Sequence, residues 1–211
     1  MAKAEKVLRI LLVEDSPEDA EQVISQLRNA GIVVRPNRVE DADALKAALD
    51  ESAPDLVLQS PKARKLGLAE TAQIVARSAK DVVLIQLLDS LTQDAVLKAM
   101  QEGARDVALR TKPDHLRTVV LREFENLQTR RQLRRAEAQW RESERRAHSL
   151  LDSSRDPIAY VHEGMHVYAN RAYLETFGFD DFEEIEGTAI LDLIAPKHAA
   201  ELRTVGGEHR R

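Results

Sequence analysis

The sequence predicts an α/β protein with a doubly wound parallel sheet, followed by a long helix and a smaller, incomplete α+β domain. Three observations lead to this prediction. Short apolar segments alternate with amphipathic segments between residues 7 and about 127, which is typical of a parallel sheet covered by helices on both faces. No Gly or Pro occurs from His115 to Arg155, and the composition changes after residue 152. We therefore expect domains at 1–127 and 152–211, joined by a helical linker at 128–151.

Each element of the first domain has its own signal. Pro17 suits the first turn of a helix that Ser16 caps, and Gly31 marks the end of that helix. Pro36 favours an edge strand. Right-handed crossovers then complete the doubly wound arrangement. The apolar runs predict strands at 7–13, 32–39, 55–59, 81–88 and 105–109, and the amphipathic runs predict helices at 17–29, 41–52, 67–79 and 91–103.

Composition limits the possible functions. Apolar residues make up 43% of the 211 residues but aromatic residues only 4%, so aliphatic side chains must fill the core. A net charge of −5 argues against a dedicated nucleic-acid binder, and the absence of cysteine excludes disulfides and thiol chemistry. No apolar run approaches the roughly 18 residues of a membrane span, and the run LRILLV is too short for a signal peptide. We expect a soluble cytoplasmic protein without a cofactor, membrane insertion or nucleic-acid partner.

The helix that begins near Pro113 is predicted to continue well beyond the first domain. Its second part, RRQLRRAEAQWRESERRAHSLL, is basic and has an apolar seam with a seven-residue repeat over three heptads. This pattern predicts a helical stalk that forms a homodimer, and a solvated connector helix is the alternative. We interpret the arginines as a solvated face rather than a nucleic-acid or membrane patch. The seam comprises Leu133, Ala136, Trp140, Ser143, Ala147 and Leu150.

The segment from 152 to 211 begins with a hairpin signal, because IAYVH and HVYAN flank Glu163-Gly164. Short helical pieces follow, with breaks at Gly178, Gly187 and Pro196. Two strands do not form a stable sheet alone. We therefore expect this domain to be incomplete and the chain to be a fragment of a longer protein.

Polar side chains follow the predicted strands of the first domain. The carboxyl ends of parallel strands share one crevice, where sites are commonly built. An alcohol there needs a neighbouring base to act as a nucleophile, and the sequence offers Ser60 none. The residues in question are Glu14 and Asp15 after the first strand, Ser60 after the third, Gln86 on the fourth, and Arg110, with Lys112 nearby, after the fifth.

Residues 7 to about 127 resemble the receiver domain of bacterial response regulators, on the segments LRILLVEDSPEDAEQVISQLRNAG, PDLVL and GARDVAL. The resemblance implies a flavodoxin-like fold with strand order 2-1-3-4-5. It also implies an aspartate that accepts a phosphoryl group after the third strand, an acid pair that holds Mg²⁺, and a Thr or Ser and a Lys that bind the phosphoryl oxygens.

The chain departs from that pattern at most of the site. Glu14 and Asp15 match the acid pair, but Ser60 stands at the acceptor position and Gln86 at the Thr/Ser position. The lysine position is open: an ungapped alignment selects Arg110, whereas Lys112 matches the Lys-Pro pair two residues late. We therefore expect no ordinary phosphotransfer and no enzyme activity. Without the acceptor carboxylate, we interpret the acid pair as exposed carboxylates that hold no metal.

Residues from 152 onward resemble the N-terminal half of a PAS domain. Three histidines of this segment, His162, His166 and His198, are candidate haem or metal ligands, but surface or hairpin positions explain them better. The matching residues are Asn170, Ala172, Gly178, Glu184 and Gly187.

A degenerate receiver, a helical stalk and a PAS domain, in that order, resemble the N-terminal half of FimX-type proteins. The resemblance implies a non-catalytic module of cyclic-di-GMP signalling that regulates type IV pilus biogenesis and twitching motility, with signalling or pilus-assembly proteins as partners and a cell pole as a candidate location. The alternative is a phosphorylation-responsive regulator or sensor-kinase fragment that uses Ser60 or His115. The segment DHLRT around His115 is similar to a sensor-kinase histidine box, but its acid precedes the histidine, as at an ordinary helix start.

Overall fold

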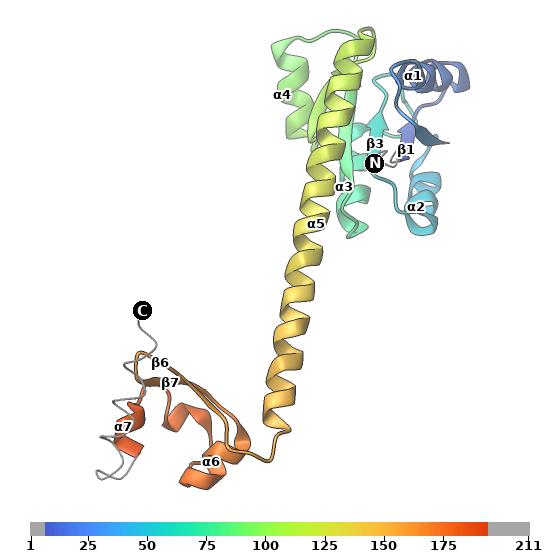
Figure 1. The fold of residues 1–211 in the computed structure, drawn as a ribbon. Helices are drawn as coiled ribbons and strands as arrows, with labels where there is room; N and C mark the ends of the chain where they lie inside the picture. Colours follow the sequence, from blue (N-terminus) through green and yellow to red (C-terminus); the bar gives the residue numbers. More distant parts are fainter. Residues whose placement is uncertain (1–6, 194–211) are drawn as a thin grey trace. The chain divides into compact units, whose positions relative to one another are not determined.

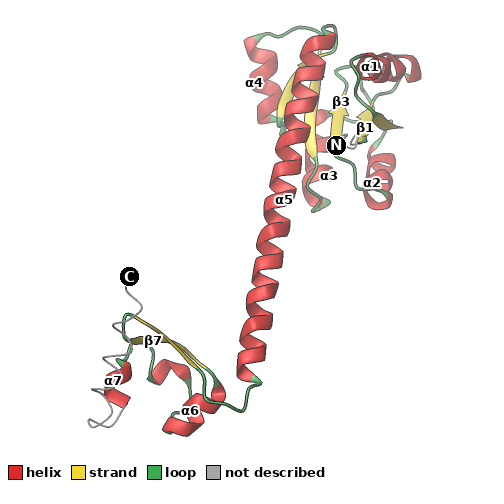
Figure 2. Cartoon of the chain, viewed as in Figure 1, coloured by secondary structure: helices red, strands yellow, loops and turns green. Residues whose placement is uncertain are grey.

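The structure, a computed structural model, describes residues 7–193. They form two compact units, one ending at Arg135 and the other beginning at Ala136, and each unit is described by itself. Figure 1 shows the elements of both, and Figure 2 separates their helices from their strands.

The first unit is a five-stranded parallel sheet in the order β2-β1-β3-β4-β5. This confirms the predicted doubly wound α/β fold and its strand order. Helix α5 runs without interruption over 40 residues, as the absence of Gly and Pro predicts. The elements are β1 Leu8–Val13, α1 Pro17–Asn29, β2 Val34–Val39, α2 Ala42–Glu51, β3 Leu56–Gln59, α3 Leu68–Arg77, β4 Val83–Leu88, α4 Gln93–Gln101, β5 Asp106–Leu109 and α5 Pro113–Asp152.

Local chemistry sets where helix α1 begins and ends. The Ser16 hydroxyl accepts a hydrogen bond from the Asp19 amide at 3.2 Å, and Pro17 occupies the first turn. At the other end Gly31 adopts a φ of 78°, which closes the helix. The amide of Ile32 still bonds to the carbonyl of Leu27. Strand β2 therefore begins at Val34, two residues later than predicted.

Aliphatic side chains form the core in two layers, one on each face of the sheet. Leu8, Ile10 and Leu12 of β1 pack against α1 and α5, whereas Leu11 and Val13 face the layer formed by α2, α3 and α4. This alternation along one strand is the two-residue period of a sheet that is buried on both faces. The nearly continuous apolar strands of the sequence follow directly from it.

The second unit contains the C-terminal part of α5 and a two-stranded antiparallel hairpin. The hairpin turns at Glu163 and Gly164, which both have positive φ, as a tight two-residue turn requires. A small core of Ala169, Tyr173, Leu174 and Ile185 lies beside it. The predicted break at Pro196 lies outside the described residues. The elements are β6 Ala159–His162, β7 Met165–Ala169, α6 Arg171–Phe177, η1 Phe182–Glu184 and α7 Ile190–Leu193.

Candidate functional site

The acid pair lies at the carboxyl end of β1. Glu14 is only 2% exposed, and its carboxylate accepts a hydrogen bond from the Ser16 amide at 3.1 Å. Asp15 is half-buried, and its Oδ2 accepts a hydrogen bond from the Arg64 amide at 3.0 Å. The expectation that both carboxylates are exposed is therefore wrong. They are built into the turns that follow β1, because loop amides need acceptors there.

Ser60 lies at the end of β3, beside the end of β1. Its amide donates to the carbonyl of Val13 at 3.0 Å, which extends the pairing of the two strands by one residue. The side chain is 3% exposed, and its oxygen accepts a hydrogen bond from the Lys62 amide at 3.2 Å. Ser60 therefore stabilises the turn after β3.

Two buried glutamines line the neighbouring strands. The Gln86 amide group donates to the carbonyl of Leu87 at 2.8 Å, while its Oε1 is buried without a hydrogen-bond partner. Gln59, which the sequence marked only as a strand end, donates to Leu66 O at 2.9 Å and accepts from the Thr71 hydroxyl at 2.8 Å. Gln59 therefore attaches β3 to the start of α3.

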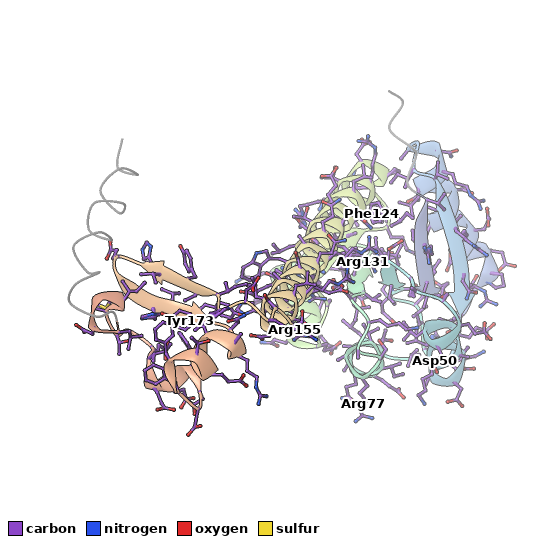
Figure 3. All side chains as sticks on the ribbon, turned by 60° about the horizontal axis from the view of Figure 1, so that its bottom comes forward. Asp50, Arg77, Phe124, Arg131, Arg155 and Tyr173 are labelled. Carbon is purple, nitrogen blue, oxygen red and sulfur yellow. The ribbon has the colours of Figure 1, made fainter. Side chains whose placement is uncertain are left out.

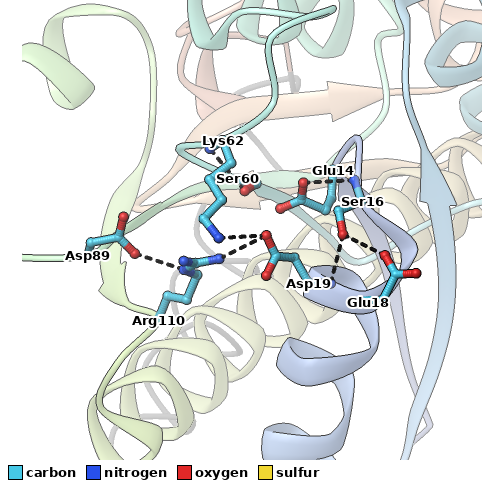
Figure 4. A network of polar contacts seen from close by, with 8 residues as sticks. All are labelled: Glu14, Ser16, Glu18, Asp19, Ser60, Lys62, Asp89 and Arg110. Atoms are coloured by element: carbon cyan, nitrogen blue, oxygen red, sulfur yellow. Dashed lines mark hydrogen bonds and ion pairs between the residues drawn. The ribbon is translucent and has the colours of Figure 1, made fainter.

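The two basic residues after β5 differ in their surroundings. Arg110 lies between two acids: its Nε is 2.8 Å from Asp89, and one terminal nitrogen is 3.6 Å from Asp19 (Figure 4). Lys112 is exposed in the following turn. Arg110 is therefore the one of the two that contacts the carboxylates near the strand ends.

An ion-pair network fills the crevice between these strand ends, and Asp19 is its centre. Lys62 from the loop after β3 lies 2.7 Å from the same Asp19 oxygen that Arg110 approaches. The hydrogen bond from Lys62 lowers the pKa of Asp19 below its ordinary value, and the charge of Arg110 acts in the same direction. Sequence reasoning missed Asp19, Lys62 and Asp89. The signal for Lys62 and Asp89 was their position within three residues after the predicted strands that end at 59 and 88, whereas Asp19 lies in the first turn of a predicted helix and offered no such signal.

A further ion pair connects the basic loop after Ser60 to an acidic residue beside the crevice. Lys65 pairs with Glu40, which also lies 2.7 Å from Arg38. The hydrogen bonds from Lys65 and then Arg38 lower the pKa of Glu40, and the same contact raises the pKa of Lys65. A pocket of about 530 Å³ remains beside this loop. Its walls include Glu14, Asp15, Ser16, Asp19, Pro61, Lys62 and Arg64.

These residues do not fit the Mg²⁺ that the receiver resemblance implies. Magnesium requires near-octahedral oxygen ligands, of which carboxylates are the usual protein contribution. Here a serine hydroxyl replaces one carboxylate, and the Lys62 ammonium group is bound to Asp19 beside the pair. Within residues 7–193 no three His, Asp or Glu side chains are placed to hold a metal ion.

Arginines of α5 anchor this helix to the opposite end of the sheet. Arg131 pairs with the buried Asp55 at 2.5 Å and donates to the carbonyl of Asp81 at 2.7 Å. Arg130 and Arg134 pair with the Asp81 carboxylate at 3.1 and 3.2 Å. The interpretation of the arginines as a solvated face is wrong for Arg130 and Arg131, which are half-buried, whereas Arg134 is exposed despite its ion pair. Every residue from Gln132 to Leu150 is exposed.

In the second unit, polar side chains connect the end of α5 to the hairpin and α6. Asn170 is fully buried, donates to the carbonyls of Leu151 and Asp156, and accepts from the amides of Ile158 and Tyr173. From the sequence, Asn170 was predicted only as one of the residues that match the PAS pattern. Asn170 thus satisfies four backbone groups at once.

The candidate histidines of this unit differ in burial. His162 is exposed, whereas His166 is buried on the hairpin, so it is not a surface residue. One ring nitrogen of His166 lies 2.9 Å from the Thr188 carbonyl and the other 2.9 Å from the Tyr173 hydroxyl. Both ring nitrogens of His166 therefore have hydrogen-bond partners within the second unit. His198 lies outside the described residues.

The comparisons with known proteins bear on the first unit. No protein-family model matches the chain, and no curated protein matches it. Among solved structures, the signal receiver domain of a LuxO repressor protein from Vibrio parahaemolyticus has a TM-score of 0.53 at 19% identity, covering 61% of this chain and 98% of that one. NtrX from Brucella abortus has a TM-score of 0.53 at 22% identity, covering 62% of this chain and 30% of that one.

A third similar structure carries a yeast Spc42 trimeric coiled coil in a fusion. It has a TM-score of 0.53 at 18% identity, and it covers 70% of this chain and 99% of that one. Among residues 7–193, no helix is both long and apolar enough to cross a membrane. Because these identities are low, the likeness concerns architecture: the first unit has the flavodoxin-like fold of signal receiver domains.

Proposed function

We propose that this chain is a non-catalytic signalling and protein-interaction module in which a receiver-type unit serves as a docking surface and is not phosphorylated at the usual position. The observation that carries the proposal is the buried Ser60 at the end of β3. An ionised carboxylate is the nucleophile that phosphoryl transfer needs there, and among residues 7–193 no base lies within hydrogen-bond reach of the Ser60 hydroxyl. The Ser60 oxygen accepts a hydrogen bond from the backbone amide of Lys62.

The ion-pair network around Asp19 supports the same proposal. In a phosphorylation switch, a new phosphoryl group reorganises the loops around it through added charge. Here Lys62 and Arg110 already supply fixed charge contacts between the loop after β3, the start of α1 and the end of β5. The unit then stays in one conformation without a phosphoryl group and presents a constant surface to protein partners.

The remaining parts of the proposal rest on the resemblance of the whole chain. We assign the second unit as the N-terminal part of a PAS domain, on its hairpin and the buried Asn170 at the start of α6. Together with the receiver-type unit it supports a FimX-type protein of cyclic-di-GMP signalling. Such a protein would regulate type IV pilus biogenesis and twitching motility from the cytoplasm, with a cell pole as its candidate location.

The exposed part of α5 supports a homodimer. Leu133, Trp140 and Leu150 are 60%, 66% and 72% exposed, on a stretch of α5 in which every residue from Gln132 to Leu150 is exposed. Isolated helices gain most of their stability from packing an apolar face, and a second copy of the same seam offers such packing.

The alternative is a phosphorylation-responsive regulator or sensor-kinase fragment that uses Ser60 or His115. The burial of Ser60 argues against the first acceptor. At the second, the Nδ1 of His115 accepts a hydrogen bond from the Leu109 amide at 3.1 Å, as a residue that caps the end of β5 does. Labelling that Ser60→Ala or His115→Ala abolishes would establish the alternative.

Twitching of a strain that lacks the full-length protein tests the proposed pathway. Complementation with the full-length protein carrying Ser60→Ala is expected to restore twitching as the unaltered protein does, because the hydroxyl only stabilises a turn. Deletion of residues 136–149, which removes most of the exposed seam but keeps the arginines that anchor α5 to the first unit, is expected to abolish the rescue. A strain that twitches normally without the protein would refute the pilus assignment and leave the docking proposal to its own test.

A further inference from the structure

The amino ends of the strands in the first unit carry a second pocket, which the proposed function does not use. It measures about 680 Å³, within the size range of small-molecule sites. Strands β1 and β2 and helix α5 line it, so it belongs to the opposite end of the sheet from Ser60 (Figure 3 labels Phe124 and Arg131 of its α5 wall). The lining residues are Val7, Arg9, Arg35, Asp55, Phe124, Gln128, Arg131 and Arg135.

The charge of this pocket is unusual for an acidic chain. Four arginines and one aspartate line it, although the chain has a net charge of −5. Arg131 forms an ion pair with Asp55, the one carboxylate of the pocket. The positive charges of Arg9, Arg35 and Arg135 are therefore in excess. Among residues 7–193, none of these three makes an ion pair with a carboxylate within 4 Å. The pocket therefore has an uncompensated positive charge.

Strand register brings two of these arginines together. Arg9 and Arg35 are direct partners in the parallel pairing of β1 with β2. Both side chains are exposed, so the pairing places two positive charges beside each other at the surface, where they repel each other. Arg9 donates to the carbonyl of Ala53 at 3.3 Å, a contact that does not cancel its charge. A bound anion would relieve this repulsion, and arginine recognises phosphate through bidentate hydrogen bonds.

The other walls of the pocket are apolar or neutral. Phe124 packs against the core beneath the pocket. Val7, just before the start of β1, is half-exposed, and Gln128 offers an amide group. We propose that this pocket binds a phosphorylated small molecule with an apolar or aromatic part, the phosphate held by Arg9, Arg35 and Arg135 and the ring placed against Phe124. Nucleoside phosphates have this chemistry.

The site lies next to the anchor of α5. Arg131 lines the pocket and also holds Asp55 and the carbonyl of Asp81. A ligand in the pocket adds contacts to the same segment of the helix. Binding is therefore expected to slow amide hydrogen exchange in residues 124–135, where the helix passes the pocket.

Titration of the full chain with ADP in the absence of Mg²⁺ tests the proposal, with calorimetry and thermal unfolding as readouts. ADP is expected to bind and raise the melting temperature, and pyrophosphate to bind more weakly. Arg35→Gln and Arg135→Gln each remove a charged donor, so each is expected to weaken ADP binding about tenfold. The matched control is Arg77→Gln, an exposed arginine in the last turn of α3.

Melting temperatures of the variants without ligand show whether each variant folds. The proposal is overturned if ADP does not bind the folded chain, if Arg35→Gln and Arg135→Gln bind it as the control does, or if adenosine binds as well as ADP. Protection from hydrogen exchange at residues 124–135 by ADP, absent in the double variant, supports it.

Discussion

At the scale of single residues, the position of Ser60 was predictable and its surroundings were not. Counting from Pro54 along an apolar strand places Ser60 at the strand end, and the structure agrees. The contact between Lys62 and Asp19 joins residues 43 positions apart, and no local pattern encodes it. Burial of Glu14 was missed for a different reason: its hydrogen-bond partner, the Ser16 amide, is only two residues away, but burial depends on how the sheet and its helices pack around the strand end.

The hydrogen bond between Thr71 and Gln59 gives a first prediction. Both side chains are buried, and the valine in Thr71→Val has the same shape as threonine but no hydroxyl. Gln59 Oε1 is then left without a donor, which is expected to lower the free energy of unfolding by about 1–3 kcal/mol. Urea denaturation measures this loss. Thr176→Val, at an exposed position on α6, is the control, and equal midpoints for the two variants would show that the buried pair is unimportant.

Tyr168 gives a prediction at high pH. Burial, and then its hydrogen bond to Asp152 at 2.8 Å, raises the pKa of Tyr168 to about 12. The unfolded side chain ionises near pH 10, so the stabilisation is complete below about pH 10 and is lost as the pH rises to about 12. Tyrosinate absorbance of the folded chain should show this late step, and Tyr168→Phe should reduce its amplitude. Burial also raises the pKa of Tyr173, so that side chain still ionises late in the variant. An unchanged amplitude in Tyr168→Phe would show that Tyr168 does not contribute to the late step.

At the scale of elements, apolar periodicity was sufficient to predict every helix and strand of the first unit. The observed ends of these elements differ from the predicted ends where a turn sets the boundary, as at Gly31 before β2. The anchoring of α5 escaped prediction. Arg130, Arg131 and Arg134 occur in a basic run that reads as solvated, and their partners Asp55 and Asp81 precede two separate strands. Only the folded sheet brings these groups together.

The α5 anchor can be tested at two neighbouring arginines. Arg131→Met leaves the buried Asp55 carboxylate without its cation, which is expected to lower the free energy of unfolding by about 3 kcal/mol. Arg134→Met removes an arginine that is 66% exposed, and the expected change is below about 1 kcal/mol. Denaturant midpoints compare the two. Equal effects would mean that burial of Asp55 does not determine the strength of the anchor.

At the scale of the whole molecule, the predicted dimer depends on the exposed seam of α5. Trp140→Glu places a charge on the seam and is expected to convert a dimer to a monomer in light scattering. Arg141→Glu also introduces an acid on an adjacent exposed position, outside the seam, and is expected to leave the dimer intact. A monomeric unaltered chain, or a dimer that survives Trp140→Glu, would place association elsewhere.

A labelling experiment shows whether the receiver-type unit works without a phosphoryl group. The full chain is incubated with Mg²⁺ and radiolabelled acetyl phosphate, beside a response regulator that carries the acceptor aspartate. We expect no label on the chain, because Ser60 is buried and bonded to the amide of Lys62 and the charges around Asp19 are already paired. Mg²⁺-dependent labelling that Ser60→Ala or His115→Ala removes would contradict the account.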